Sequence, residues 1–193
     1  MGKVMFDISM SLDGLITGPD PHPSQGLGKG GERLHAWAFE GKRDPNNALV
    51  LEEMVQTSGA IVAGRRTYDI ANWGEKDPWG SQLPVFVLTH AVPKGVPAKG
   101  AVYTFVTEGV ESALDEARAA AGEKNVCVIG GATLGQQCLQ AGLLDEIHLH
   151  LVSVLLGEGT RLFEHLGPLP YDLQQSRVIE SRGVTHIRYS VIK

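Results

Sequence analysis

The sequence predicts an α/β fold with a mixed, mainly parallel sheet. Strand-like and helix-like segments alternate from end to end of its 193 residues, and no internal repeat or low-complexity block interrupts them. The last two strand-like segments, 173–181 and 184–192, are separated only by Arg182 and Gly183, a spacing typical of an antiparallel hairpin. No composition shift marks a domain boundary, so we expect a single domain over residues 1–193 that closes with this C-terminal hairpin.

Hydrophobic patterning places the other elements. In residues 3–10, Val4, Phe6, Ile8 and Met10 alternate with other residues, which predicts a first strand with one buried face. By the same reasoning we expect strands at 60–63, 85–88, 102–106, 126–129 and 146–156, short helices at 33–39 and from 67 onward, a loop at 74–84, and longer helices that begin near 46, 107 and 131.

The ends of the longer helices are expected from capping residues. Asn46 or Asn47 is the expected N-cap of the first of them, which ends before Ser58, and Thr107 is the expected N-cap of the one that ends at Gly122. The first long helix is expected to bury an apolar stripe made of Ala48, Leu51, Met54 and Val55.

A long loop is expected after the first strand, up to about Gly31. Prolines at 19, 21 and 23 and glycines at 26, 28, 30 and 31 disfavour regular structure there. Loops of this length in a compact domain are usually functional or mobile, so we expect residues 19–31 to form a lid or a substrate-facing insertion.

Composition and charge exclude several classes of function. The chain has 22 acidic and 17 basic residues and a formal net charge of -5, so no general attraction to nucleic acid or anionic lipid is expected. Cys127 and Cys138 do not form a C-x-x-C motif, which disfavours a disulfide framework and a cysteine zinc site. The same cysteine usage fits a reducing cytoplasm, where we expect the protein to be located. No apolar run approaches the ~20 residues of a membrane span, so we expect no membrane partner.

One strand end carries groups suited to a phosphate-bearing ligand. The strand 126–129 runs into Gly130 and Gly131 and then into a helix, so backbone N–H groups and the positive helix end would point at an anion. The alternative is that the two glycines only form a tight turn. The glycine order is not G-x-G-x-x-G and residues 151–153 offer no carboxylate, which disfavours an ordinary Rossmann dehydrogenase.

Two further strand ends carry polar groups of the same kind. Arg65, Arg66 and Thr67 follow the strand at 60–63, and Thr89 and His90 follow the strand at 85–88. Guanidinium groups bind phosphate well, although a solvated arginine pair with Thr67 as N-cap is an equally simple interpretation. Because the carboxyl ends of parallel strands lie at one edge of a sheet, we expect the three segments to converge.

Taken in order, these motifs resemble the dihydrofolate reductase-like superfamily, and specifically the reductase domain of the RibD C-terminal family. The resemblance spans nearly the whole chain. It is carried by Ser11-Leu12-Asp13-Gly14, by Gly64-Arg65-Arg66-Thr67-Tyr68, by Leu83-Pro84-Val85-Phe86-Val87-Leu88-Thr89, by Val128-Ile129-Gly130-Gly131-Ala132-Thr133-Leu134, and by residues 145–150 running into 157–163.

The resemblance implies a three-layer fold and a homodimeric, NADPH-dependent reductase that acts on a small molecule, similar to the 5-amino-6-(5-phosphoribosylamino)uracil reductases of riboflavin biosynthesis. Asp13 is similar to the acidic residue that faces the nicotinamide and the substrate in this family. The residues that would bind the cofactor are Gly64, Arg65, Arg66, Thr67, Thr89, His90, Gly130, Gly131, Ala132, Thr133 and Leu134.

Two departures from the family patterns matter. Dihydrofolate reductases place a carboxylate early in the helix before the Gly-Arg motif, near Ala48 here, but Asn46 and Asn47 are uncharged and Glu52 lies a turn later. The zinc deaminase signature of the bifunctional riboflavin enzymes is absent from the sequence, which excludes deamination. A dihydrofolate reductase and a non-catalytic NADPH-binding protein remain alternatives.

Two candidate residues have simpler interpretations as well. Asp13 precedes Gly14, and Asp-Gly is a common turn pair, so its carboxylate could accept hydrogen bonds from backbone N–H groups. His148 and His150 share one face of a predicted strand, but the sequence places no third ligand beside them, and we expect no metal site.

Overall fold

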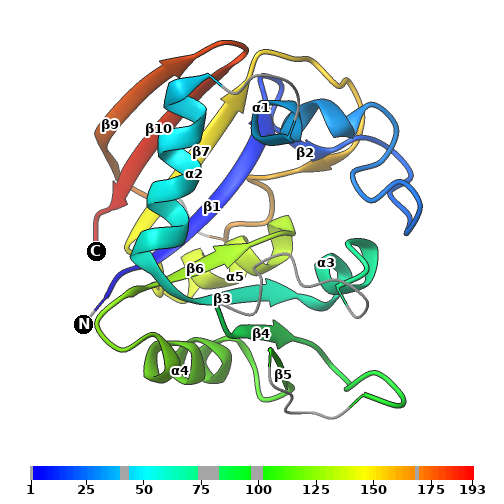
Figure 1. Ribbon diagram of the computed structural model, residues 1–193, viewed down its shortest axis with the longest axis vertical. Helices are drawn as coiled ribbons and strands as arrows, with labels where there is room; N and C mark the ends of the chain where they lie inside the picture. Colours follow the sequence, from blue (N-terminus) through cyan, green and yellow to red (C-terminus); the bar gives the residue numbers. More distant parts are fainter. Residues whose placement is uncertain (1, 40–43, 74–82, 97–101, 168–169) are drawn as a thin grey trace.

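The computed structural model describes residues 2–39, 44–73, 83–96, 102–167 and 170–193. The strands of its main sheet are β1 (Val4–Ser11), β3 (Ser58–Gly64), β4 (Val85–Leu88), β5 (Tyr103–Val106), β6 (Asn125–Ile129), β7 (Glu146–Val152), β9 (Leu173–Ser181) and β10 (Val184–Val191). They follow the order β5-β4-β3-β6-β1-β7-β10-β9, shown in Figure 1. Pairing is parallel from β5 to β7, and β10 is antiparallel to both β7 and β9. The predicted fold class and C-terminal hairpin are confirmed.

Helices cover both faces of this sheet. They are α1 (Ala36–Phe39), α2 (Pro45–Thr57), α3 (Arg65–Ile70), α4 (Val110–Ala121) and α5 (Ala132–Gln140), with the 3-10 helix η1 (Gly31–His35) before α1. In Figure 1, α2 runs along the half of the sheet that is made of β1, β7 and β10. A second, two-stranded sheet pairs β2 (Leu15–Thr17) with β8 (Thr160–Arg161).

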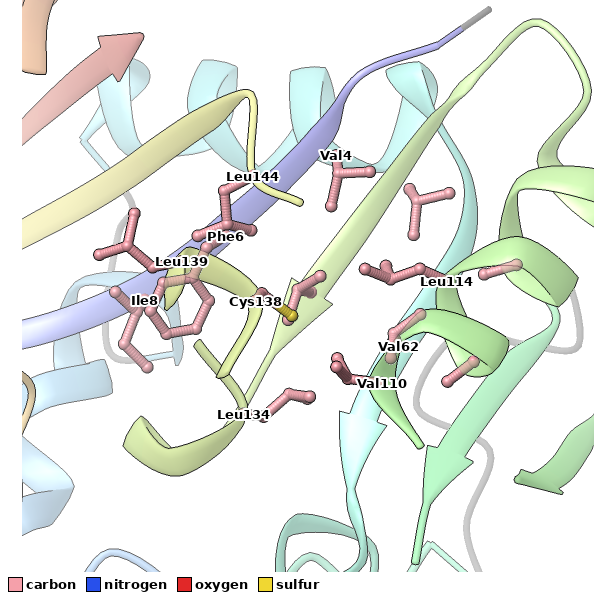
Figure 2. Close-up of a cluster of buried hydrophobic side chains, with 14 of the residues drawn as sticks. Val4, Phe6, Ile8, Val62, Val110, Leu114, Leu134, Cys138, Leu139 and Leu144 are labelled. Carbon is pink, nitrogen blue, oxygen red and sulfur yellow. The ribbon is translucent and has the colours of Figure 1, made fainter. Parts of the chain in front are cut away.

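The larger apolar core lies between the sheet and the helices α4 and α5. Figure 2 shows Val4, Phe6 and Ile8 of β1 facing this core, as their alternation predicts. Leu114 of α4 and Cys138 of α5 are fully buried against them. Burial raises the pKa of the Cys138 thiol to about 12, so this cysteine behaves as a small apolar side chain.

The capping predictions for two helices are wrong. The N-cap of α2 is Asp44, whose Oδ1 accepts from the N–H of Asn46 at 2.9 Å while Pro45 occupies the first helical position. The N-cap of α4 is Gly109, and Thr107 instead donates its hydroxyl to the carboxylate of Glu108. Asp44 thus caps α2 with its side chain, whereas α4 begins without a side-chain cap.

Three further predictions need correction. The predicted strand 146–156 ends at Val152, and β2 was missed because it is only three residues long. The predicted apolar stripe of α2 is not buried: Val55 is 37% exposed, and Asn47 is the buried residue of this helix. Met54 of this stripe is partly buried and packs against an apolar cluster that contains Met5 of β1. Most of the loop expected at 74–84 lies outside the described residues.

Candidate functional site

The carboxyl ends of four neighbouring parallel strands form one edge of the sheet. The strands β4, β3, β6 and β1 are adjacent, and their registers pair Leu88 with Gly64 and Ala63 with Ile129. The three predicted segments leave the sheet from these neighbouring positions. The structure therefore brings them together at one edge, and we call this edge, with the residues that follow the four strands, the carboxyl edge.

Gly130 and Thr67 make a close contact between two of these segments. Gly130 has a φ of 99°, a backbone conformation that other residues rarely adopt. A Cβ atom at this position would overlap the hydroxyl group of Thr67. The glycine is therefore required both for its conformation and for the packing of the turn after β6 against α3.

The first turn of α5 is available to an anion. Its N-cap is Gly131, which gives no side-chain cap, and a Cβ atom at Gly131 would meet no atom within 4 Å. Ala132 and Leu134 point their side chains into the core, and Thr133 is exposed. The unpaired N–H groups of a helix start and the helix dipole both favour a negatively charged group at such a position.

The two arginines have different environments. Arg65 donates from Nε to both carboxylate oxygens of Asp69, at 2.8 and 2.9 Å, and from Nη1 to the carbonyl of Ala91 at 3.0 Å. It thus joins α3 to the turn after β4. Arg66 is exposed and makes one long hydrogen bond, 3.4 Å, to the carbonyl of Pro21 in the 19–31 loop. Of the two, Arg66 is the better placed to reach a ligand.

The two predicted residues in the turn after β4 differ in their exposure. Thr89 is buried, its hydroxyl donates to the carbonyl of Ala91 at 2.8 Å, and it accepts from the Ala91 N–H at 3.3 Å. His90 is exposed at the surface of this edge. Thr89 therefore shapes the turn, and His90 is the one of the two whose side chain is accessible to a ligand.

Asp13 is fixed by three hydrogen bonds. Its carboxylate accepts from the Ser11 hydroxyl at 2.5 Å and from the backbone N–H groups of Gly157 and Leu156 at 2.7 and 3.2 Å. The Ser11 hydroxyl and the Gly157 N–H are the main groups that lower the pKa of Asp13 to about 2. Asp13 thus joins the turn after β1 to the segment after β7, which is the turn role left open by the sequence, and it is ionised at neutral pH.

A second polar cluster, which the sequence analysis did not predict, lies on the face of the sheet beneath α1 and α2. Asp7 pairs in register with His148, and Ser9 pairs with His150, which pairs with His186. All of these except Asp7 are less than 9% exposed. Trp37 covers them, with its ring centroid 4.6 Å from that of His150 and its Nε1 donating to the Ser9 hydroxyl at 3.0 Å.

The hydrogen bonds of this cluster form a directed chain. The side-chain amide of Asn47 donates to the carbonyl of Trp37 at 3.2 Å, so its oxygen must accept from Nε2 of His186 at 2.9 Å. Neutral His186 then accepts at Nδ1 from Nδ1 of His150, at 2.8 Å. Nε2 of His150 faces Asp7 Oδ1 at 3.1 Å, and this contact needs one proton between them.

The protonation states of His186 and Asp7 agree with these hydrogen-bond assignments. Burial, followed by the charge on His150, lowers the pKa of His186 to about 4, so His186 is neutral at pH 7. Burial alone would raise the pKa of Asp7, but the charge and hydrogen bond of His150 lower it below its usual value. The ionised carboxylate of Asp7 therefore accepts the hydrogen bond from Nε2 of His150.

A signal for this cluster was present in the sequence. Asp7, Ser9 and Ser11 alternate with apolar residues along β1, and Glu146, His148 and His150 alternate along β7. Polar residues at a period of two on two neighbouring strands indicate a polar sheet face. Which helix covers that face, and how the side chains pair, depend on tertiary contacts that periodicity does not contain.

A mainly parallel sheet with glycine turns and a helix start at its carboxyl edge is typical of nucleotide-binding α/β proteins. The chain matches the family model of the RibD C-terminal domain over residues 2–185, and it therefore belongs to the RibD C-terminal domain family. The resemblance inferred from the motifs is confirmed.

Curated relatives include two proteins of Bacillus subtilis (strain 168). The uncharacterized protein YyaP is 25% identical over 171 residues, which cover 83% of this chain and 80% of YyaP. The uncharacterized protein YwjB is 27% identical over 169 residues, which cover 85% of this chain and 84% of YwjB. Both alignments extend over most of each protein.

Solved structures confirm the fold. A protein of Shewanella sp. PV-4 described as a riboflavin biosynthesis protein has a TM-score of 0.73 at 23% identity, and the alignment covers 99% of both chains. A pyrimidine reductase-like protein from Corynebacterium diphtheriae has a TM-score of 0.66 at 16% identity, covering 99% of this chain and 92% of that one. The bifunctional deaminase/reductase of Thermotoga maritima has a TM-score of 0.66 at 13% identity, and this chain spans 57% of it.

Among the residues that the structure describes, no helix is both long enough and apolar enough to span a membrane.

Proposed function

We propose that this protein is an NADPH-dependent reductase that transfers a hydride to a C=O or C=N group of a small heterocyclic or sugar-derived substrate. The observation that carries the proposal is the carboxyl edge, where a glycine turn, an uncapped helix start and two arginines come from adjacent strands. The RibD C-terminal family, to which the chain belongs, is a reductase domain family. Bound NADPH would supply the hydride from its nicotinamide ring.

The residues at this edge fit a dinucleotide. Open space lies in front of Gly64 and Gly131, where an added Cβ atom would meet nothing within 4 Å, so a ligand can approach the backbone closely. We assign the pyrophosphate to Gly130, Gly131 and the first turn of α5, Ala132–Leu134. Arg66 and His90, on the neighbouring segments, would bind the adenosine 2′-phosphate, while Arg65, Thr67 and Thr89 hold those segments in place.

For the substrate, 5-amino-6-(5-phosphoribosylamino)uracil is the first candidate. It is the substrate named for the reductase of the Thermotoga maritima protein, whose fold this chain shares. Asp13 lies where β1 reaches the carboxyl edge, and we assign it a positioning role: it holds the Leu156–Gly157 segment and keeps a fixed negative charge beside the substrate. Because its pKa is about 2, Asp13 is not a proton donor at neutral pH.

Dihydrofolate is a weaker candidate for the substrate. The first turn of α2 carries no acidic residue, and Asn47, the buried residue there, uses its amide for His186 and Trp37. The carboxylate that a pterin ring requires at this position is therefore replaced by an amide that already has its partners.

Cofactor binding tests the proposal directly. We expect the protein to bind NADPH more tightly than NADH in fluorescence titrations, and Arg66→Ala to remove most of that preference. Losing charge-assisted hydrogen bonds to a phosphate should raise the NADPH Kd by about 10- to 100-fold. Equal affinity of the parent protein for the two cofactors would contradict the assignment.

Two controls separate binding from chemistry. Arg182→Ala removes the same charge at the exposed β9–β10 turn and should leave NADPH affinity unchanged. Asp13→Asn should also keep NADPH affinity but lower the rate of NADPH oxidation with 5-amino-6-(5-phosphoribosylamino)uracil. NADPH binding without oxidation in the presence of any carbonyl or imine substrate would instead favour the non-catalytic alternative.

A further inference from the structure

The 19–31 loop has backbone hydrogen bonds of its own. Two of them close its base and two close its tip, and a loop that is closed in this way moves as one unit. The bonded pairs are Gly18 with Leu27 at 2.8 Å, Pro19 with Lys29 at 3.0 Å, and His22 with Gln25, which exchange two bonds of 2.8 and 3.3 Å.

The tip of this loop packs against the last residue of α3. A Cβ atom added at Gly26 would overlap Cγ2 of Ile70, so the loop backbone lies directly against the helix. Figure 1 shows the loop, in blue, beside α3. Because glycine has no Cβ, it permits this close approach, and a larger side chain at position 26 would separate the two segments.

Arg66 makes a second contact between the loop and α3. Its Nη2 donates to the carbonyl of Pro21 at 3.4 Å, and its side chain is exposed. A guanidinium group has five N–H donors, so one that donates to a carbonyl can also bind a phosphate. Arg66 is the residue assigned above to the adenosine 2′-phosphate of the cofactor. The loop therefore contacts the same side chain that the phosphate would bind.

A shared arginine couples its two partners energetically. An exposed arginine side chain loses conformational entropy when it is held in one position. A phosphate bound to Arg66 would hold the guanidinium group, so the hydrogen bond to Pro21 would then form at a smaller entropic cost. Coupling of this kind is reciprocal: contact with the loop must favour phosphate binding by the same factor.

We propose that the 19–31 loop responds to the 2′-phosphate of the cofactor through Arg66. Phosphate binding strengthens the contact between the loop and α3, and loss of that contact weakens phosphate binding. The inference rests on the proposed function, because it requires a 2′-phosphorylated cofactor at Arg66. It adds that the loop contributes to the preference for NADPH without donating a side chain to the cofactor.

Hydrogen exchange measured by mass spectrometry tests the proposal on the full-length protein. NADPH and NADH differ only in the 2′-phosphate, so we expect the amides of residues 19–31 to exchange about fivefold more slowly with saturating NADPH than with saturating NADH. In Arg66→Ala, saturating concentrations of the two cofactors should give equal exchange in this loop. A difference that persists in Arg66→Ala would overturn the role of Arg66.

The same titrations separate failure of this proposal from failure of the proposed function. Tighter binding of NADPH than of NADH, with equal exchange of the loop, would overturn only the coupling. Equal affinity for the two cofactors would overturn the assignment of the 2′-phosphate to Arg66, and the coupling with it.

The reciprocal effect is measured by changing the loop. Gly26→Val places a side chain against Ile70 and alters no residue assigned to the cofactor. We expect it to raise the Kd of NADPH about fivefold and that of NADH by less than about twofold. Gln25→Ala, at the exposed neighbouring position, should change neither Kd. Thermal unfolding shows whether each variant is folded. Unchanged NADPH affinity in a folded Gly26→Val protein would overturn the coupling.

Discussion

The side chains on the two faces of β1 are buried in different kinds of environment. Phe6 and Ile8 point to one side, into the apolar core under α4 and α5, whereas Asp7 and Ser9 point to the other, into a hydrogen-bonded cluster under α1 and α2. The residues are neighbours on one strand, so the difference comes from what covers each face. One face is stabilised by apolar area, and the other by donors and acceptors that must be matched one by one.

These two kinds of stabilisation respond differently to change. An apolar core loses free energy in proportion to the atoms removed, largely independently of pH and salt. A buried polar cluster contributes little net stability while it is complete, but it is costly when one partner is lost or changes its protonation. Mutations and pH changes can therefore separate the faces.

The largest expected effect is on the apolar face. Leu114 of α4 is completely buried, and Leu114→Ala should lower the free energy of unfolding by about 2–5 kcal/mol through lost burial and the cavity that remains. Urea unfolding measured by circular dichroism tests this. The matched control is Leu49→Ala on α2, where the side chain is 47% exposed and the change should stay within about 0.5 kcal/mol. Similar losses for the two variants would contradict the described core.

Acid should weaken the polar face selectively. The pKa of His186 is about 4 in the folded protein against 6.5 as its ordinary value, so the unfolded chain binds more protons between these pH values. The stabilisation that comes from neutral His186 is therefore complete above pH 6.5. It is lost as the pH falls toward 4, which lowers the free energy of unfolding by up to about 3 kcal/mol. Burial lowers the pKa of His35 and His148 as well, and both act in the same direction.

Urea unfolding from pH 7.5 to 4.5 measures this dependence. In a His186→Gln variant the loss between these pH values should become smaller, because Gln does not titrate. The same difference should not appear in Leu114→Ala, whose destabilisation comes from the apolar face. A stability curve that is flat between pH 6.5 and 4.5 in the parent protein would show that these histidines are not buried as described.

The smallest expected effect is at the edge of the polar face. Glu53 of α2 accepts from Arg177 at 2.6 Å and from Arg188 at 2.9 Å, and so joins the helix to β9 and β10. Glu53→Gln should cost about 1 kcal/mol at pH 7 and less at high salt, because the group is partly exposed. The control, Glu52→Gln, changes an exposed neighbour and should cost less. Equal effects, independent of salt, would exclude a role for these ion pairs.

The apolar half of this comparison could be predicted from the sequence, whereas for the polar half the sequence indicates a polar sheet face but not how its side chains pair. The alternation of Val4, Phe6 and Ile8 and the buried run at 126–129 located the strands that carry the core, since apolar periodicity follows directly from burial on one face. The same periodicity placed Gly130 and Gly131 at a strand end, and adjacency of parallel strands then brought them beside Thr67.

Predictions that depended on single side-chain contacts were less accurate. Asp44 rather than Asn46 or Asn47 caps α2, because several residues near a helix start can accept the same N–H group. The role of Arg65 could not be read from its position, because it depends on Asp69 one helical turn later and on a carbonyl from another strand. The cluster around His150 joins residues up to 143 positions apart, as in the hydrogen bond between His150 and Asp7.

The overlap between a side chain at position 130 and the hydroxyl group of Thr67 also bears on how this fold changes during evolution. Neither position can be replaced freely while the other stays as it is: a larger residue at 130 requires a smaller one at 67, together with a rearranged turn. Homologous sequences that keep the turn after β6 should therefore keep glycine at 130, and those that replace it should carry a smaller residue at 67, although the two positions lie 63 residues apart.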